Sequence, residues 1–406
     1  MTTPEKHATA DGLATSAGAM LLFLLAAFLG LQPLSTDVYL PSLPAIAMHF
    51  EATQVAVQST LSVFIAVFAF GQLVVGPMSD RFGRRPMVIG GLLLYLAASA
   101  GCALAPDLGW LVLARIPQAL GLCCTVLCAR AIVRDMFEPE TGTRVMAQAL
   151  GWMTGITLVG PIVGGALQSQ FGWRAAFVAL AAISAVLAVL ALRHLPESNR
   201  HRARDATRLG PLLANYATIA RSGDFRAYTL TVTFSYCCLF TFISGSSFVL
   251  IRVLGLSPTL YGVAFGVATT GFLPGTLVAR RLQPMIGLRR TVAAGGLLML
   301  AAGATLLGLA FAGVQSVAAV VVPTFFVLMA HGVLQPTCQI GAMSAFPRNA
   351  GAATALVGFS MHLAAAALGL ALGASHDGTT LPLGVATFIV SLLAALCGQW
   401  VLRRAP

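Results

Sequence analysis

The stretch GPMSDRFGRRP, from Gly76 to Pro86, joins two long apolar runs and contains four charged side chains. Its glycines permit a tight turn and a close approach of two helices, and Asp80 can accept hydrogen bonds from a helix N-terminus or pair with an arginine. We therefore expect a structured loop whose charge contacts latch the two halves of the protein together on the cytoplasmic side and break when that side opens. An ordinary basic loop is the alternative. The expected latch residues are Gly76, Asp80, Arg81, Gly83, Arg84 and Arg85.

The apolar runs beside this loop recur along the whole chain. Hydrophobic residues make up 58% of 406 positions and charged residues only 9%, and the mean hydropathy is +0.87. Runs of about 20 residues, enough to cross a hydrocarbon core of about 30 Å as helix, predict an all-α integral membrane protein. The twelve predicted transmembrane helices cover 15–42, 55–78, 86–105, 109–131, 143–169, 174–194, 226–250, 258–279, 288–312, 317–343, 350–374 and 381–402.

The positions of the charges explain the net charge of +11 better than nucleic-acid binding does. Arginines gather in every second loop, whereas the intervening loops hold only Arg174 and Arg252. By the positive-inside rule, this alternation predicts that both termini lie in the cytoplasm. The first run is too long for a signal-peptide core, so we expect it to remain as a helix. All eight cysteines fall inside apolar runs, which indicates packing rather than disulfide or metal chemistry.

The longest charged stretch, at 195–210, separates six predicted helices from six. A weak echo of Gly83-Arg84-Arg85 in Gly287-Leu288-Arg289-Arg290 favours a duplicated half, with Ala279 near the place that Asp80 occupies in the first. Any latch should therefore be asymmetric. The expected domains are a cytoplasmic tail at 1–14, a six-helix bundle at 15–194, a cytoplasmic linker at 195–225, a second bundle at 226–402 and a tail at 403–406.

Polar residues within the spans follow a second period. The first, fourth, seventh and tenth helices carry polar side chains, and the third, sixth, ninth and twelfth carry almost none. Polar faces in a membrane turn toward protein or a water-filled cavity, so the polar helices should line a central path. Repeated three-helix units around a cavity are a transporter layout. The residues that we expect to line a substrate cavity are Tyr39, Gln118, Tyr236, Phe240 and Gln339.

Asp37 and Arg115 are charges placed inside spans, where a charge costs several kcal/mol unless it is paired or functional. At 1.5 Å per residue both lie about 10 Å from the same membrane face, which predicts a pair on the cavity wall. Burial favours the neutral form of a carboxylate and a nearby cation favours the charged form, so Asp37 is expected to exchange a proton as Arg115 moves. A static ion pair that only fixes helix packing remains the alternative.

Two further features have open interpretations. The fifth helix contains Gly155, Gly160, Pro161, Gly164 and Gly165, which permit a bend and a close helix approach. His331 and His362 lie near the middle of the tenth and eleventh helices. Their titration range suits a second proton site, but a packed histidine bonded to a neighbouring helix is the favoured interpretation.

Several of these motifs resemble those of one family. Gly76–Arg85 is similar to the G-x-x-x-D-R-x-G-R-R motif of the major facilitator superfamily, and Gly155–Gly165 to the G-x-x-x-x-G-P-x-x-G-G element of its antiporters. Asp37–Pro44 resembles the D-x-Y-L-P-x-L-P signature of its Bcr/CflA branch, the bicyclomycin and chloramphenicol resistance-like proteins, as do Arg130–Asp135 and Ile243–Leu250. Arg115 matches the intramembrane arginine of its drug:proton antiporters.

The resemblance implies two six-helix bundles related by pseudo-two-fold symmetry, alternating access, and proton-coupled efflux of small drugs or metabolites from a bacterial inner membrane. A metabolite importer or facilitator of the same fold is the alternative. An enzyme is disfavoured because the sequence shows no metal-ligand cluster, phosphate-binding loop or nucleophile–base set. We expect no cofactor and no metal, since a proton gradient supplies the energy. The expected partners are a small-molecule substrate, protons and the lipid bilayer but no nucleic acid, and we expect a monomer, although no sequence feature bears on oligomeric state.

Overall fold

The computed structural model describes residues 16–199, 207–375 and 377–403, and this part of the chain is helical throughout. Twelve of its helical segments are long and apolar enough to cross a membrane, so the protein is a multi-pass membrane protein. The twelve predicted spans are confirmed. The largest differences are at the ends of the first and eighth spans, which reach His49 and Ile286 rather than 42 and 279.

The elements of the first half and of the second half follow the same order of long helices. The first half comprises α2 (Ser16–Asp37), η1 (Leu40–Ser42), α3 (Leu43–His49), α4 (Gln54–Phe82), α5 (Arg84–Ala103), α6 (Leu108–Met136), α7 (Pro139–Phe171) and α8 (Arg174–His194). The second comprises α10 (Gly223–Ser247), η2 (Phe248–Val253), α11 (Pro258–Thr269), α12 (Phe272–Ile286), α13 (Leu288–Phe311), α14 (Val317–Ser344), η3 (Pro347–Asn349), α15 (Ala350–Ala374) and α16 (Leu381–Arg403).

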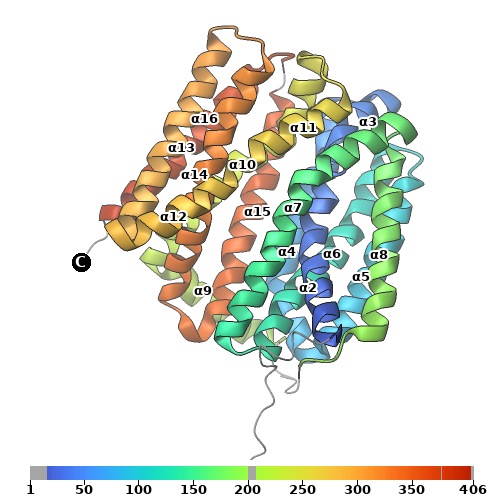
Figure 1. Cartoon of the computed structure of the whole chain (residues 1–406), viewed down its shortest axis with the longest axis vertical. Coiled ribbons are helices and arrows are strands. Elements are labelled where there is room, and N and C mark those ends of the chain that lie inside the picture. The colour runs from blue at the N-terminus through green and yellow to red at the C-terminus, as the bar shows by residue number, and fades with distance from the viewer. Residues whose placement is uncertain (1–15, 200–206, 376, 404–406) are drawn as a thin grey trace, which may run out of the picture.

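The two halves are six-helix bundles that lie side by side (Figure 1). Within the first, α5 packs on α6 and α8, and α2 packs on α7; within the second, α13 packs on α14 and α16. The bundles meet along α4 with α15 and along α7 with α11. A short helix, α9 (Leu209–Arg221), lies in the segment that was predicted to be a linker.

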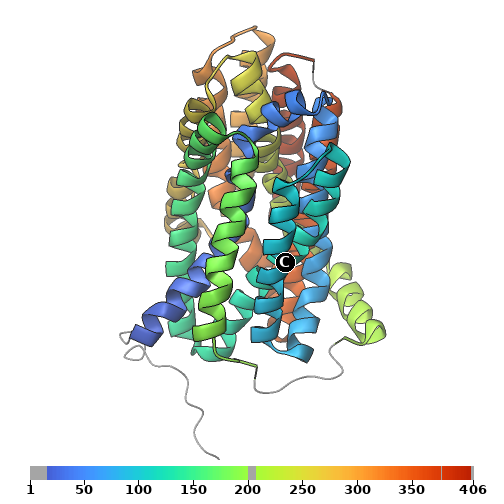
Figure 2. The ribbon, with the colours of Figure 1, turned by 90° about the vertical axis from the view of Figure 1, so that its right-hand side faces the viewer.

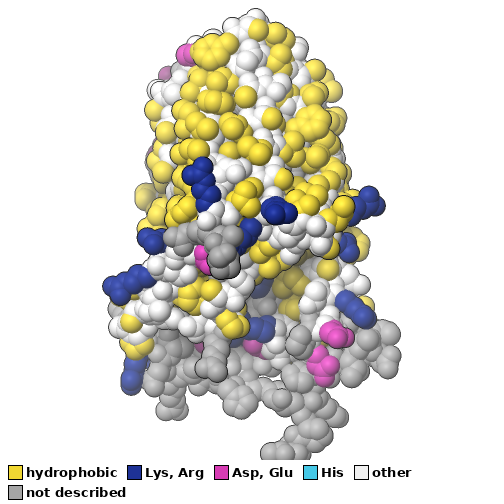
Figure 3. Space-filling model, turned by 90° about the vertical axis from the view of Figure 1, so that its left-hand side faces the viewer, with side chains coloured by type: hydrophobic (Ala, Val, Ile, Leu, Met, Phe, Trp, Pro, Cys, Tyr) yellow, Lys and Arg dark blue, Asp and Glu magenta, His cyan; other side chains and the backbone are white. Residues whose placement is uncertain are grey.

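We call the face that carries α9 the linker face, and the other the opposite face. The helices α2, α10 and α15 begin at the linker face, where α9 lies low in both ribbon views (Figures 1 and 2). The surface in Figure 3 shows a broad apolar area, with arginine side chains collected toward the linker face. This arrangement matches a bilayer around the apolar area and a basic border on one side of it.

Helix ends and close approaches follow from particular residues. Gly83, between α4 and α5, has a φ of 107°, which favours glycine, so the loop can turn sharply there. Gly271 separates α11 from α12, and a Cβ on it would overlap the carbonyl oxygen of Phe325 in α14. The eighth span therefore approaches α14 backbone to backbone. All eight cysteines are free thiols, and six of them are buried, as expected of packing residues.

Candidate functional site: a cavity between the two halves

A cavity of about 270 Å³ lies between the bundles. It is lined from α2, α4, α6 and α7 of the first half and from α10, α11, α12, α14 and α15 of the second. In the described chain, no lining residue comes from α5, α8, α13 or α16, which are the third, sixth, ninth and twelfth spans. The first, fourth, seventh and tenth spans line the cavity, as the period of polar residues predicted. The second, fifth, eighth and eleventh spans line it as well, which was not predicted.

The cavity is closed at the opposite face. There Gln58 of α4 donates a 2.9 Å hydrogen bond to the carbonyl of Ser244 in α10, and Arg252 donates to the carbonyl of Pro44 at 3.3 Å. Toward the linker face the lining continues to Met343, one residue before the end of α14, and to Thr354 in the first turn or so of α15. The cavity is therefore closed at the opposite face, and its lining residues extend almost to the linker face.

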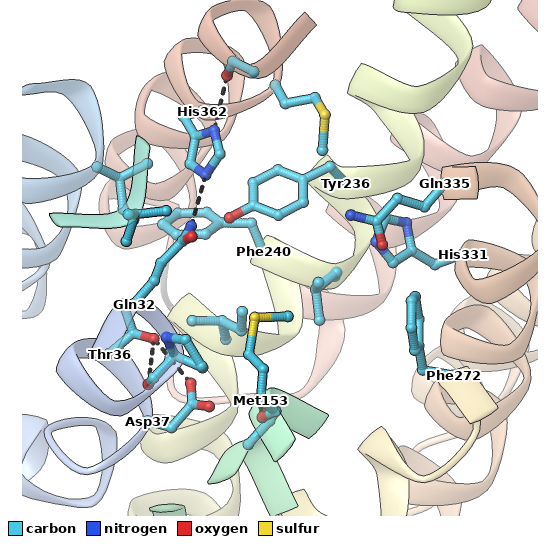
Figure 4. Close-up of a pocket in the computed structure, with 18 of the residues that line it drawn as sticks. Gln32, Thr36, Asp37, Met153, Tyr236, Phe240, Phe272, His331, Gln335 and His362 are labelled. Atoms are coloured by element: carbon cyan, nitrogen blue, oxygen red, sulfur yellow. Dashed lines mark hydrogen bonds between the residues drawn. The ribbon is translucent and has the colours of Figure 1, made fainter. Parts of the chain in front are cut away.

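Asp37 lies on the cavity wall at the last residue of α2 (Figure 4). Its side chain is only 3% exposed. Its Oδ1 accepts a 2.9 Å hydrogen bond from the hydroxyl of Thr36, and its Oδ2 has no hydrogen-bond partner. Gly160 of α7 lies against it, since a Cβ on that glycine would be 3.2 Å from the Cβ of Asp37. The carboxylate therefore has one oxygen available to a proton or a ligand.

Arg115 does not pair with Asp37 in this structure, so the predicted ion pair is wrong here. Its guanidinium donates to the carbonyl of Thr60 at 3.3 Å and to Oε1 of Gln118 at 2.7 Å. Its Cζ lies 4.1 Å from the ring centroid of Phe64, and the rings of Tyr39 and Phe177 also face it at 4.7 and 5.7 Å. Aromatic faces and two acceptors therefore stabilise the Arg115 cation within the first bundle without a carboxylate beside it.

Tyr39 and Gln118 are also absent from the cavity wall, contrary to our prediction. The helix α2 ends at Asp37, so Tyr39 lies beyond it and turns into the first bundle, where its hydroxyl is hydrogen-bonded to that of Thr60. The amide of Gln118 donates to the hydroxyl of Ser99 at 2.8 Å. Together with Arg115 these side chains form a buried polar cluster inside one half.

Tyr236, Phe240 and Gln339 line the cavity as expected. In Figure 4, Tyr236 and Phe240 of α10 lie between a wall with Gln32, Asp37 and His362 and a wall with His331 and Gln335. Two of the polar lining side chains that the prediction missed are Gln72 of α4 and Arg130 of α6. Gln72 could have been noticed as a polar residue in an apolar run. Arg130 was treated only as part of a helix exit.

Both histidines are bonded to neighbouring helices, as the favoured interpretation held, and both face the cavity. The ring of His331 is hydrogen-bonded through Nδ1 to the hydroxyl of Ser235 in α10 at 2.8 Å. The Nδ1 of His362 lies 2.8 Å from the carbonyl of Gly358, which requires an N–H there, and its Nε2 lies 3.3 Å from the amide nitrogen of Gln32. A neutral ring, donating at Nδ1 and accepting at Nε2, satisfies the contacts with Gly358 and Gln32. The Nδ1 also lies 3.2 Å from the amide nitrogen of Gln72 in α4.

The glycines of the fifth span form close contacts at the closed end. A Cβ on Gly164 would overlap the carbonyl of Val38, and one on Gly165 would overlap the carbonyl of Pro258 in α11. In return, a Cβ on Gly262 would overlap the carbonyl of Pro161. Gly155 is different, because nothing lies within 4 Å of its Cβ position. Gly164 and Gly165 therefore pack on both halves, and Gly155 does not in this structure.

The loop after α4 makes its charge contacts within the first half and with the linker. Arg84 is buried; it donates through Nε to Asp135 at 2.9 Å and through Nη2 to Asp80. Glu197 accepts from the backbone N–H groups of Arg84 and Arg85. Arg81 donates to the hydroxyl of Thr207 at 2.7 Å, and nothing lies within 4 Å of a Cβ position on Gly76. These contacts of the loop join it to the first half and the linker, so they form no latch between the two halves in the described chain.

Comparison with known proteins shows to which family this chain belongs. A model described as the Major Facilitator Superfamily matches residues 23–370, and the chain belongs to this family. The predicted superfamily is thereby confirmed. The fold and the family are those of a membrane transporter rather than an enzyme.

The relatives carry the names that the sequence motifs suggested. The chain is 28% identical over 381 residues to "Multidrug resistance protein D" of Escherichia coli, covering 93% of this chain and 94% of that protein. It is 25% identical to "Bicyclomycin resistance protein homolog" of Haemophilus influenzae, covering 90% and 92%. It is 29% identical to "Chloramphenicol resistance protein" of Pseudomonas aeruginosa, covering 83% and 80%.

Among solved structures, the chain is similar to a bacterial homologue of the human lysosomal transporter Spinster. The TM-score is 0.73 at 18% identity, and the match covers 96% of this chain and 98% of that one. At this identity the similarity shows the shared fold alone.

Proposed function

We propose that the protein exports small drugs or metabolites from a bacterial cytoplasm in exchange for protons, by alternating access. The observation that carries the proposal is the carboxylate of Asp37, which lies in the cavity with Oδ2 unpartnered. A carboxylate that has lost bulk water and has no cation beside it favours the protonated form, and a bound substrate can alter that preference. Competition of substrate and proton for one buried group couples their movements.

The orientation follows from the charges. Arginines at the ends of spans gather at the linker face, including Arg84, Arg85, Arg280, Arg281 and Arg403. We therefore assign the linker face and both termini to the cytoplasm and the protein to the bacterial inner membrane. In that orientation the structure represents the state that takes up substrate from inside. The names of the relatives, which refer to multidrug, bicyclomycin and chloramphenicol resistance, support export.

In the export cycle that we propose, a substrate enters from the linker face and displaces the proton of Asp37. The glycine contacts between α7 and α11 then part, while the linker face closes and the loop after α4 engages as a latch. Substrate leaves at the opposite face, Asp37 is reprotonated there, and the protein returns. In this scheme no cofactor takes part, and one chain suffices because the cavity is complete within it.

The test uses the purified protein in liposomes that contain a pH-sensitive dye, together with a growth-inhibition panel across antibiotics in an efflux-deficient host. Asp37→Asn should abolish resistance and substrate-induced proton release while the protein remains folded. Glu51→Gln, which changes an exposed acid at the opposite face, should leave both unchanged. Undiminished proton release from Asp37→Asn would contradict the proposal, and uptake driven by an inward proton gradient would indicate an importer instead.

A further inference from the structure

Arg130 is the guanidinium that the proposed cycle leaves unused. It lies on α6, lines the cavity and is exposed within it. It makes no ion pair with any acid in the described part of the chain. Arg84 and Arg115 differ, since Arg84 donates to two acids, and Arg115 is buried against a carbonyl, an amide oxygen and an aromatic ring. Arg130 therefore presents its donors to whatever enters the cavity.

None of the acids in the described first half makes an ion pair with Arg130. Glu138 and Glu140 are exposed at the start of α7, beyond the linker-face end of α6. Asp80 and Asp135 are bonded to Arg84, and Glu197 accepts from the backbone of Arg84 and Arg85. Arg130 lies about 9 Å from the linker-face end of α6, whereas Asp37 lies about 30 Å along α2 from its start at that face, counting 1.5 Å per residue. The two charges of the cavity thus act at different depths.

Closure of the linker face would not supply a carboxylate from the second half either. From residue 207 to the end, the sequence contains two acids, Asp224 and Asp377. Asp224 lies at the start of α10 near Arg289, and Asp377 lies at the other end of the molecule, just before α16. An arginine that lines the cavity without an ion pair to a described acid is suited to a ligand that carries a carboxylate.

We infer that Arg130 is the anion-binding residue of the cavity and that the transported compounds carry an oxyanion group, such as a carboxylate, on an apolar or aromatic body. This inference rests on the proposed function in that it takes the cavity as the substrate site. A guanidinium binds a carboxylate through two parallel charge-assisted hydrogen bonds. Tyr236, Phe240 and Phe272 offer aromatic surface farther along the cavity. A cation near the cavity mouth also repels lipophilic monocations, which a lone acid would otherwise attract.

The test measures binding to the purified full-length protein in detergent, without a proton gradient. The probes are naphthaleneacetate, naphthaleneacetamide and naphthylethylamine, which share the ring system and differ in charge. Wild type should bind the carboxylate about tenfold more tightly than the amide, as expected for a charge-assisted pair, and the amine most weakly. Arg130→Gln should remove that preference and leave amide binding within about twofold, a change of under half a kcal/mol. Arg130→Lys should retain part of the preference.

Arg134→Gln is the matched control, because Arg134 lies one turn closer to the linker face on the same helix and is largely exposed. It should leave the preference intact. Three results would overturn the inference: no carboxylate binding to wild type, equal binding of carboxylate and amide, or an equal loss for all three probes in Arg130→Gln. Charge-selective binding combined with proton release that Asp37→Asn does not affect would reject the proposed exchange and leave this inference standing.

Discussion

The hydroxyl of Tyr216 in α9 donates a 2.9 Å hydrogen bond to the backbone carbonyl of Leu73 in α4. In a regular helix the N–H of the residue four positions after Leu73 would donate to this carbonyl. That position is Pro77. Proline has no N–H, so the carbonyl would otherwise lack a donor. The linker helix thus supplies the bond that the proline removes, and it connects the linker to the first half just before the loop that was predicted to be a latch.

Tyr216→Phe should lower the free energy of unfolding by about 1 kcal/mol, because it leaves a carbonyl without a partner. In a Pro77→Ala background the alanine N–H can bond to Leu73, so the same change should cost less. A double-mutant cycle on thermal stability measures this difference. Burial raises the pKa of Tyr216 above its usual value near 10, so the hydroxyl remains a donor at any pH suited to the assay. Equal costs in both backgrounds would contradict the assigned role.

Gly165→Ala should prevent the opposite face from closing as it does here, because its Cβ would overlap the carbonyl of Pro258. Overpacking of this kind costs about 1 to 3 kcal/mol. We expect lower transport and greater labelling of a cysteine introduced at the opposite face. Gly155→Ala is the comparison in the same helix, since its Cβ meets nothing within 4 Å. Similar labelling of the two variants would argue against a closing role for Gly165.

Arg115→Met should destabilise the protein by about 2 kcal/mol or more, because the carbonyl of Thr60 and the amide of Gln118 would each lose a donor. Since Arg115 makes no pair with Asp37 here, its effect on stability should add to that of Asp37→Asn. Thermal unfolding of the two single variants and the double variant checks this additivity. A coupling above about 1 kcal/mol would show that the two charges interact after all.

His362→Leu should weaken the connection of α15 to α2 and α4, because the contacts of its ring with Gln32 and Gln72 are lost. A loss of about 1 kcal/mol in stability is expected, as for other buried hydrogen bonds. Proton release for each substrate bound should stay as in the wild type, since a neutral ring satisfies the contacts with Gly358 and Gln32. Calorimetric measurement in two buffers of different ionisation enthalpy gives that proton number. A lower number would make His362 a second proton site.

The bilayer made the twelve spans predictable from the sequence, because it requires long apolar helices wherever the chain crosses. The same physics explains why the polar helices were correctly assigned to the cavity. Tyr236, Phe240 and Gln339 are cavity residues on spans that were chosen for their polarity. These predictions depend on composition and length, which a sequence shows directly.

The rotation of each helix was not predictable, because it depends on how side chains of adjacent helices interlock. Arg115 and Arg130 lie on the same helix, yet one faces an aromatic cage within the first bundle and the other faces the cavity. Equal depth therefore did not make Arg115 a partner of Asp37. Tyr39 was misplaced for a related reason: a hydropathy profile does not show that α2 stops two residues before it.

The contact between α7 and α11 includes two close approaches of backbone, with Gly165 against Pro258 and Gly262 against Pro161. At these two positions the glycines have no side chain that must withdraw when the helices part or find its rotamer when they meet again. Ordering a side chain costs up to about 2 kcal/mol in conformational entropy, and glycine has none to order. The helices α7 and α11 can thus separate and return to the same register at these positions with little cost in side-chain entropy. This suits a barrier that must open once in every turnover.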